Sequence, residues 1–240
     1  MSWLLPVQAS AHAGEIDTIM LLVHALMFAL AFGWGAVFIY TLVRFRRSRQ
    51  PKADHGGVRS RMSTYAEVGI VLAELILLVG FSIPAWASRL REVPEASEAV
   101  VIRVTGEQFA WNVHYPGPDA AFGRTDLALV GADNPVGLDP ASAAGRDDIT
   151  AVNELVVPIG RPVVVQLSAK DVIHSFGVPA MRIKQDANPG MMTTAWFTPT
   201  QLGEFDVACS QLCGLGHYRM RAVLRVVSQD EFARWLDGAR

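Results

Sequence analysis

The 240-residue sequence has only two cysteines and no large excess of charge of either sign. Lysine and arginine total 21 against 23 aspartates and glutamates, which gives a formal net charge of −2. A nucleic-acid-binding face would need a basic excess, so this balance argues against nucleic acid as a partner. The chain also lacks a Cys-x-x-Cys-His motif. That absence excludes a covalent haem on this chain.

Lysine and arginine are missing from residues 1–18 as well. A secretory signal peptide has a basic first region and a short apolar core. The apolar run at 19–43 is longer than such a core, contains no charged residue, and is followed by several arginines. We therefore predict a retained helix rather than a cleaved signal.

Two segments, 19–43 and 66–88, approach or exceed the roughly 20 apolar residues that a membrane-spanning helix needs. The loop at 44–61 is strongly basic and has a single acid, Asp54. Its basic residues are Arg44, Arg46, Arg47, Arg49, Lys52, Arg59 and Arg61. Because positive loops stay in the cytoplasm, the N-terminus and everything after about residue 89 are predicted to lie outside. The alternative is a solvated linker without topological meaning.

These features predict a membrane anchor at 1–91 and an external domain at 92–240. The external domain reads as all-β, since short alternating or β-branched runs are bounded by Gly, Pro and Asp. The predicted strands are 100–105, 109–115, 154–159, 162–168, 172–178, 193–198, 204–208 and 221–227. A final helix is predicted at 229–238, with Ser228 as its N-cap and Glu231 in a capping box.

A loop-rich insertion is predicted at 116–149, where six aspartates stand against Arg124 and Arg146. Long irregular insertions in compact domains are usually functional or disordered. An acidic outer loop could steer a basic redox partner by long-range attraction. The alternative is a solvated excursion with no special role.

The two cysteines belong to one short motif, Cys209-Ser-Gln-Leu-Cys213-Gly-Leu-Gly-His217-Tyr-Arg-Met220. Thiolates, an imidazole and a thioether form a soft ligand set that favours copper over magnesium, calcium or manganese. Gly214 and Gly216 predict a bent loop in which these side chains can converge.

A copper site of this type needs a second histidine. His174 is the best candidate, because it ends a strong β run, and His114 is the alternative. A disulfide between the two cysteines is also possible outside a membrane. It would close only a small ring, however, and would not need the neighbouring histidine and methionine. Zinc is disfavoured by the methionine.

The motif at 209–220, together with Asp171-Val-Ile-His174-Ser-Phe, resembles subunit II of the haem–copper cytochrome c oxidases, and the resemblance covers the whole chain. It implies two transmembrane helices followed by a cupredoxin-like Greek-key sandwich outside the membrane. It also implies two copper ions in a CuA centre, bridged by both cysteine sulfurs. The implied further ligands are His174, His217, Met220 and the backbone carbonyl of Gln211.

The resemblance implies an electron-transfer subunit of a proton-translocating oxidase in a bacterial-type cytoplasmic membrane. Electrons would come from an external cytochrome c or copper protein, with supercomplex membership open, and would pass to haem in a catalytic subunit. A quinol oxidase subunit would lack the copper ligands, and a nitrous-oxide reductase would need more histidines than the six present. The remaining alternative is a membrane-tethered copper carrier or assembly factor.

The chain departs from the family pattern at several positions. Gln211 replaces the usual glutamate, and a neutral amide is a poorer ligand for a hard cation, which weakens the expectation of magnesium at the subunit interface. In the family, electrons enter at a short aromatic stretch, and here its first position is Phe109. Either Phe109 or Trp111 could mark the face on which the electron donor docks, or both could be core residues. Glu67 and Glu74 are expected at a proton route or a subunit interface.

Overall fold

The computed structural model describes residues 5–52, 55–56 and 60–238 and divides the chain into two compact units. One unit is Glu15–Arg91, and the other combines Met1–Gly14 with Glu92–Arg240. Asp54 and Arg59 of the predicted basic loop lie outside the described residues.

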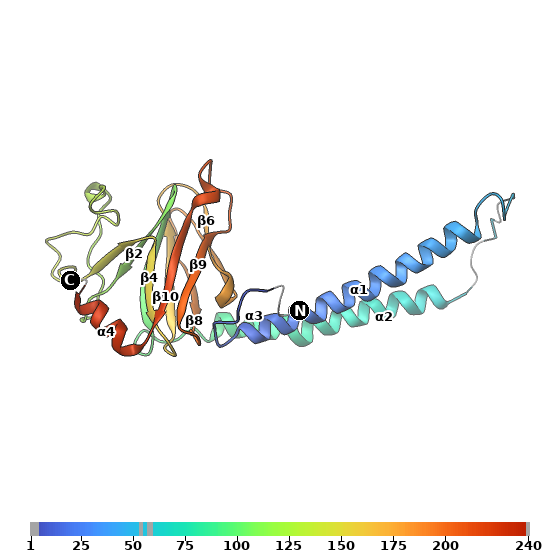
Figure 1. Ribbon diagram of the computed structural model, residues 1–240, viewed down its shortest axis with the longest axis horizontal. Helices are drawn as coiled ribbons and strands as arrows, with labels where there is room; N and C mark the ends of the chain where they lie inside the picture. Colours follow the sequence, from blue (N-terminus) through green and yellow to red (C-terminus); the bar gives the residue numbers. More distant parts are fainter. Residues whose placement is uncertain (1–4, 53–54, 57–59, 239–240) are drawn as a thin grey trace. The chain divides into compact units, whose positions relative to one another are not determined.

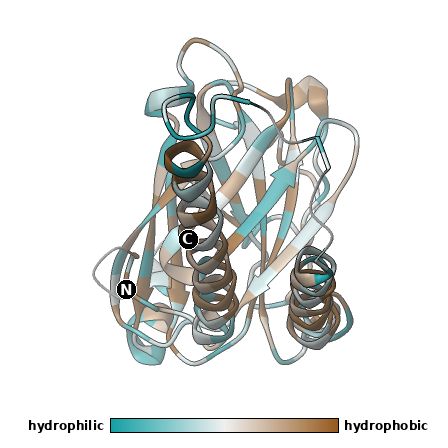
Figure 2. Cartoon of the chain, turned by 90° about the vertical axis from the view of Figure 1, so that its right-hand side faces the viewer, coloured by the Kyte–Doolittle hydropathy of each residue, from teal (hydrophilic) through white to brown (hydrophobic). Residues whose placement is uncertain are grey.

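The first unit consists of two long helical stretches. Helix α1 spans Ala13–Arg44, and α2 spans Met62–Leu77 before a π turn, η2 (Leu78–Ser82), leads into α3 (Ile83–Arg91). Both stretches are long and apolar enough to cross a membrane. Hydrophobic residues recur along their whole length (Figure 2). The helices extend beyond the predicted spans at both ends.

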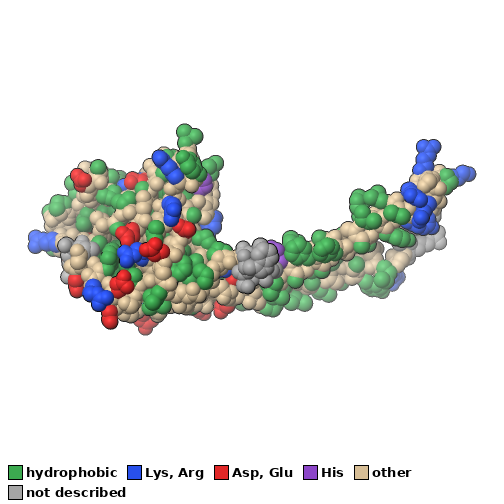
Figure 3. All heavy atoms as spheres, viewed as in Figure 1, with side chains coloured by type: hydrophobic (Ala, Val, Ile, Leu, Met, Phe, Trp, Pro, Cys, Tyr) green, Lys and Arg blue, Asp and Glu red, His purple; other side chains and the backbone are tan. Residues whose placement is uncertain are grey.

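The π turn is explained by Pro84, which lies two residues after its last residue, Ser82. Proline has no backbone N–H, so it cannot complete the regular α-helical ladder. The Ile83 N–H instead bonds to the carbonyl of Leu78, five residues back. The described basic residues of the loop gather at the far end of the helices from Pro84 (Figure 3).

The second unit is built on two five-stranded sheets (Figure 1). The first has the order β3-β2-β1-β5-β8, with β1 and β5 parallel, and the second has the order β4-β10-β9-β6-β7, with β4 and β10 parallel. The strands are β1 (Val100–Glu107), β2 (Ala110–Tyr115), β3 (Ile149–Val152), β4 (Glu154–Pro158), β5 (Val163–Ala169), β6 (His174–Val178), β7 (Ile183–Ala187), β8 (Thr193–Phe197), β9 (Gly203–Cys209) and β10 (Arg221–Val227). Two apolar helices followed by a domain of two β-sheets match the predicted order of a helical anchor and an all-β domain.

The core lies between the two sheets. Side chains alternate along β1, so Val100, Ile102 and Val104 are buried, as expected for period-two strands with one buried face. Tyr115 is fully buried, and its hydroxyl both donates to the carbonyl of Val156 and accepts from its N–H. These two hydrogen bonds tie the end of β2 in the first sheet to β4 in the second.

Two strands, β3 and β7, were not predicted. β3 has only four residues, and β7 contains Lys184, Gln185 and Asp186 at a sheet edge. Edge strands can carry polar residues because one side of the strand meets solvent. The last helix, α4 (Gln229–Gly238), begins as predicted, with the Ser228 Oγ accepting from the Glu231 N–H at 3.2 Å.

The insertion at 116–149 contains one short 3₁₀ turn, η3 (Leu127–Leu129). Asp148 holds its two ends, since its carboxylate accepts from the N–H groups of Gly117 and Gly123 and from His114 of β2. Phe122 packs edge-on against His114 and under the Arg103 guanidinium. The insertion thus covers the outer face of β1 and β2.

The N-terminal segment before α1 belongs to the β domain, although the sequence placed it with the anchor. The Ala9 N–H donates to the Ala180 carbonyl at 2.9 Å, and the Thr200 N–H donates to the Ala9 carbonyl at 2.8 Å. The Ser10 hydroxyl donates to the Met181 carbonyl at 2.7 Å. These bonds are long-range in sequence, which is why local patterns do not predict them.

Candidate metal centre

The predicted copper ligands meet at one end of the β domain. His174 begins β6, Cys209 ends β9, and the other side chains lie in the loop that leads into β10. In Figure 1 this loop projects beyond the strands at the top of the domain. His174 is fully buried and Cys209, Cys213 and Met220 nearly so, while His217 is half-buried. The ligands therefore form an interior site beneath an exposed loop.

Each thiol faces the other thiol and a different imidazole. Both cysteines are free, with their sulfur atoms 3.8 Å apart. Cys209 Sγ is 3.9 Å from His174 Nδ1, and Cys213 Sγ is 3.6 Å from His217 Nδ1. The ligand atoms of His174, Cys209 and Cys213 all lie within 4.8 Å of one another.

Two further donors flank the thiols. The Cys209 Sγ lies 3.1 Å from the carbonyl oxygen of Gln211, and the Cys213 Sγ lies 3.7 Å from the Met220 Sδ. The Gln211 side chain itself is exposed. Its backbone, not its amide, is therefore the part that reaches the cluster.

Two glycines allow the loop to fold so tightly. Gly214 has φ +134°, a conformation that residues with a side chain rarely adopt. A Cβ on Gly216 would collide with the ring of Phe109. The glycines therefore permit both the bend and the close packing of Phe109 beneath the loop.

Asp171 orients His174, a role that sequence reasoning missed. Its carboxylate accepts from His174 Nε2–H at 2.9 Å and from the N–H groups of Gln108 and Val172. Burial acts to raise the pKa of Asp171, but these hydrogen bonds outweigh it and hold the pKa below its usual value. The bond fixes the tautomer that leaves Nδ1 free to face the sulfurs.

Gln108 was also missed as a supporting residue. Its Nε2 donates to the carbonyl of Cys213 at 2.6 Å, which ties the start of the copper loop to the turn between β1 and β2. Burial raises the pKa of the Cys213 thiol to about 11, with a further contribution from Cys209. The thiol is thus protonated at neutral pH, and a metal ion must displace its proton to bind.

The two candidate aromatic residues occupy different environments. Trp111 is fully buried and packs edge-on against His174 and Phe176, with ring centroids 6.0 and 5.5 Å away. Phe109 is half-buried, under the copper loop, and the Arg219 guanidinium lies 5.7 Å from its ring centroid. Only Phe109 lies near the surface.

The alternative histidine, His114, is not part of this cluster. It lies on the outer face of β2 beneath the insertion, and its Nε2 donates to Asp148.

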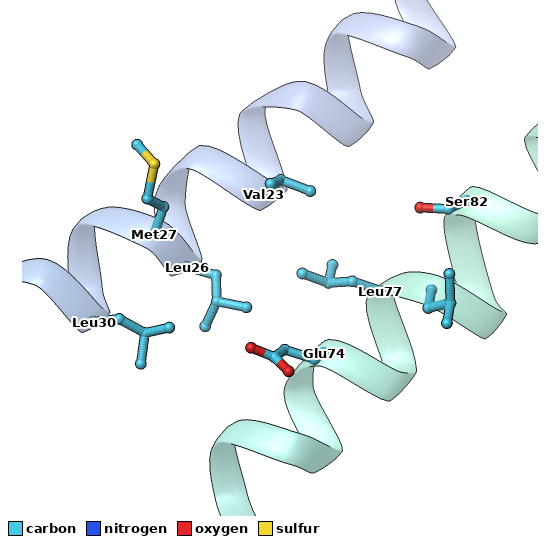
Figure 4. A pocket seen from close by; sticks show the side chains of 8 residues that line it. Val23, Leu26, Met27, Leu30, Glu74, Leu77 and Ser82 are labelled. Atoms are coloured by element: carbon cyan, nitrogen blue, oxygen red, sulfur yellow. The ribbon is translucent and has the colours of Figure 1, made fainter. Parts of the chain in front are cut away.

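The two glutamates of the second helix differ in their surroundings. Glu74 lines a cavity of about 390 Å³ between α1 and α2, opposite Leu26 and Leu30 of α1 (Figure 4). Ser82, at the end of the π turn, is the other polar side chain that lines it. Glu67 lies two turns earlier on α2, outside this cavity, and is exposed.

The donor set decides which metal fits. Two thiolates, imidazole nitrogens and a thioether in a buried pocket suit copper, whereas hard cations need oxygen ligands. The chemistry of these residues therefore favours copper as the metal.

Comparisons with known proteins point to one family. The family model described as cytochrome c oxidase subunit II, periplasmic domain, matches residues 100–227. The alternative cytochrome c oxidase subunit 2 of Bradyrhizobium diazoefficiens is 33% identical over 199 residues, which cover 82% of this chain and 70% of that protein. Cytochrome c oxidase subunit 2 of Cereibacter sphaeroides is 32% identical over 216 residues, covering 85% and 69%.

A solved structure is also similar. The periplasmic domain of subunit II of cytochrome oxidase from Bradyrhizobium japonicum is 36% identical and aligns with 61% of this chain and 96% of that chain, with a TM-score of 0.45. Family membership rests on the family model and the full-length relatives rather than on this superposition.

Proposed function

This chain belongs to the cytochrome c oxidase subunit II family and is the subunit through which electrons enter a haem–copper oxidase, and we propose that they enter at a binuclear CuA centre. Its ligands would be His174, Cys209, Cys213, His217, Met220 and the backbone carbonyl of Gln211.

One observation carries the proposal of two copper ions. The two sulfurs are 3.8 Å apart, and each lies within 4 Å of the Nδ1 of a different imidazole: Cys209 Sγ is 3.9 Å from His174, and Cys213 Sγ is 3.6 Å from His217. A mononuclear site would need only one thiolate with two imidazoles. Two thiolates together with two imidazoles would offer enough soft donors to hold two copper ions, with one imidazole available to each.

Copper would supply a one-electron acceptor and donor at this site. The protein's contribution is to hold the ligands still. His174 is fixed by Asp171, and the loop is anchored by Gln108 and by the strands β9 and β10 on either side. Burial of both sulfurs excludes water from the ligand atoms, which limits solvent rearrangement during electron transfer.

Several partners and placements follow from this proposal. We propose that electrons arrive from an external cytochrome c or small copper protein and leave toward haem in the catalytic subunit. The half-buried Phe109 is the favoured surface aromatic for this transfer. The two helices would cross a bacterial cytoplasmic membrane, with the N-terminus and the β domain outside and Glu67 and Glu74 at a proton route or a subunit interface.

The test is the copper content of the full chain purified in detergent. We expect two copper ions per chain that remain after dialysis and give a multi-line copper resonance, and Cys213→Ser should abolish that resonance. A single, loosely held ion would instead favour the copper carrier. A colourless protein with a disulfide, after reduced protein has been offered copper, would disprove the proposal.

A further inference from the structure

The two cysteines of the proposed copper site are held in different ways. Cys209 is the last residue of β9, and the second sheet holds it from both sides. It pairs with Phe176 of β6, and its N–H donates to the carbonyl of Met220 at 3.2 Å. Ladder bonds of this kind involve only the backbone. The sheet itself therefore fixes the position of Cys209.

Cys213 lies outside the strands, in the loop between β9 and β10. The chain bends directly after it, at Gly214, which has φ +134°. A side chain ties its backbone to the rest of the domain, because the Gln108 Nε2 donates to the Cys213 carbonyl at 2.6 Å. Gln108 thus does for Cys213 what the sheet does for Cys209.

The Gln108 amide contacts the copper loop at the bend itself. A Cβ added to Gly214 would collide with the Nε2 of Gln108, and one added to Gly216 would collide with the ring of Phe109. Gln108 and Phe109 are consecutive residues of the turn between β1 and β2. This turn is therefore the surface on which the loop that carries Cys213 rests.

Gln108 also reaches the other half of the site, through its backbone. Its N–H donates to the Asp171 carboxylate at 2.8 Å, and the same carboxylate accepts from the His174 Nε2–H at 2.9 Å. One residue thus supports His174 through its backbone and Cys213 through its side chain. Because a substitution changes only the side chain, the two connections can be separated by experiment.

We propose that Gln108 is a positioning residue for the copper centre, and that its side-chain amide holds Cys213, and with it His217, where the two halves of the centre are equivalent. The inference rests on the proposed CuA function. Two metal ions share an unpaired electron evenly only when their ligand surroundings match, so a displaced Cys213 would make them unequal. Partners outside the ligand set commonly fix the orientation of metal ligands in this way.

The test compares the two halves in Gln108→Met, using the full chain loaded with copper in detergent. Methionine has a similar length but cannot donate the hydrogen bond. We expect the ring signals of His217 in paramagnetic proton NMR to shift and those of His174 to stay, and copper loss to a chelator to become about tenfold faster. The His174 Nε2–H is identified by slow exchange in heavy water, because it is buried and bonded to Asp171.

The matched control is Gln229→Met. The Gln229 Nε2 donates to the Ile159 carbonyl at 2.8 Å, which is the same kind of bond at the start of α4, away from the site. This variant should leave both ring signals and the rate of copper loss unchanged. A milder variant is Gln108→Asn, which keeps the donor but shortens the side chain by one methylene. It should shift the same ring signals by a smaller amount.

Unchanged ring signals and copper loss in Gln108→Met would overturn the proposal. Equal shifts in both rings would overturn it as well, because they would show a general loosening of the site. If Gln108→Met binds no copper, Gln108→Asn decides by the same criteria. If the wild-type protein itself shows no multi-line copper resonance, it is the proposed function that fails, so the two failures are distinguishable.

Discussion

Two of the buried histidines of the β domain, His174 and His114, are each hydrogen-bonded to an aspartate. His174 donates from Nε2 to Asp171, and His114 donates from Nε2 to Asp148. The two imidazoles are almost equally inaccessible, at 0% and 2% exposed. Burial and an aspartate partner therefore do not distinguish the proposed metal ligand His174 from the structural residue His114.

The difference lies on the other side of each ring. His174 turns Nδ1 toward two thiols, whereas His114 packs against Phe122. The partner aspartates differ as well. Asp148 is fully enclosed and binds both ends of the insertion, while Asp171 is partly exposed and binds the loop beside the copper ligands. One pair supports the proposed copper site, and the other holds a loop.

Replacing each histidine by alanine should give the largest contrast. His174→Ala removes one of two terminal nitrogens, so we expect loss of the two-copper resonance with the fold retained. His114→Ala should keep that resonance but lower the stability of the domain by about 1–3 kcal/mol, because Asp148 loses a buried partner. For both variants we would measure the copper content, the copper resonance and the thermal unfolding midpoint. Retention of two copper ions by His174→Ala would show that the ligand assignment is wrong.

A smaller contrast comes from the aspartates. Asp171→Asn removes a negative charge next to a ligand, which favours the reduced site, and should raise the reduction potential by an amount on the order of tens of millivolts with copper content unchanged. Asp148→Asn should leave the potential unchanged. A redox titration of the full chain, monitored through the absorption of the copper site, gives the reduction potential of each variant for this comparison. Equal shifts in both variants would mean that the effect is not local to His174.

The candidate site could be proposed from the sequence because four of the proposed ligand side chains lie within twelve consecutive residues, and soft donors at this spacing favour copper. The supporting residues could not, since Asp171 and Gln108 act only through contacts that tertiary folding creates. The position of Trp111 was predictable in principle. Val113 and Tyr115 share its face of β2 and are buried, so alternation places Trp111 in the core and leaves Phe109 at the turn.

The same comparison predicts the pH range in which each of the two histidine–aspartate pairs affects the stability of the fold. Burial lowers the pKa of His114, and the hydrogen bond and charge of Asp148 only partly oppose it, with Arg103 acting in the same direction as burial.

The folded state therefore binds the His114 proton less readily than the unfolded chain, whose histidine pKa is about 6.5. The unfolded state gains protons first as the pH falls, so His114 stabilises the fold above about pH 6.5, and that contribution is lost as the pH drops through the lowered folded pKa.

We expect the unfolding midpoint of the full chain in detergent to fall as the pH drops below about 6.5, and His114→Gln to flatten that slope. Asp171, whose lowered pKa belongs to a carboxyl with a usual value near 4, acts only at more acidic pH. A slope that persists unchanged in His114→Gln would assign it to another group and would leave the His114–Asp148 pair without a role in acid stability.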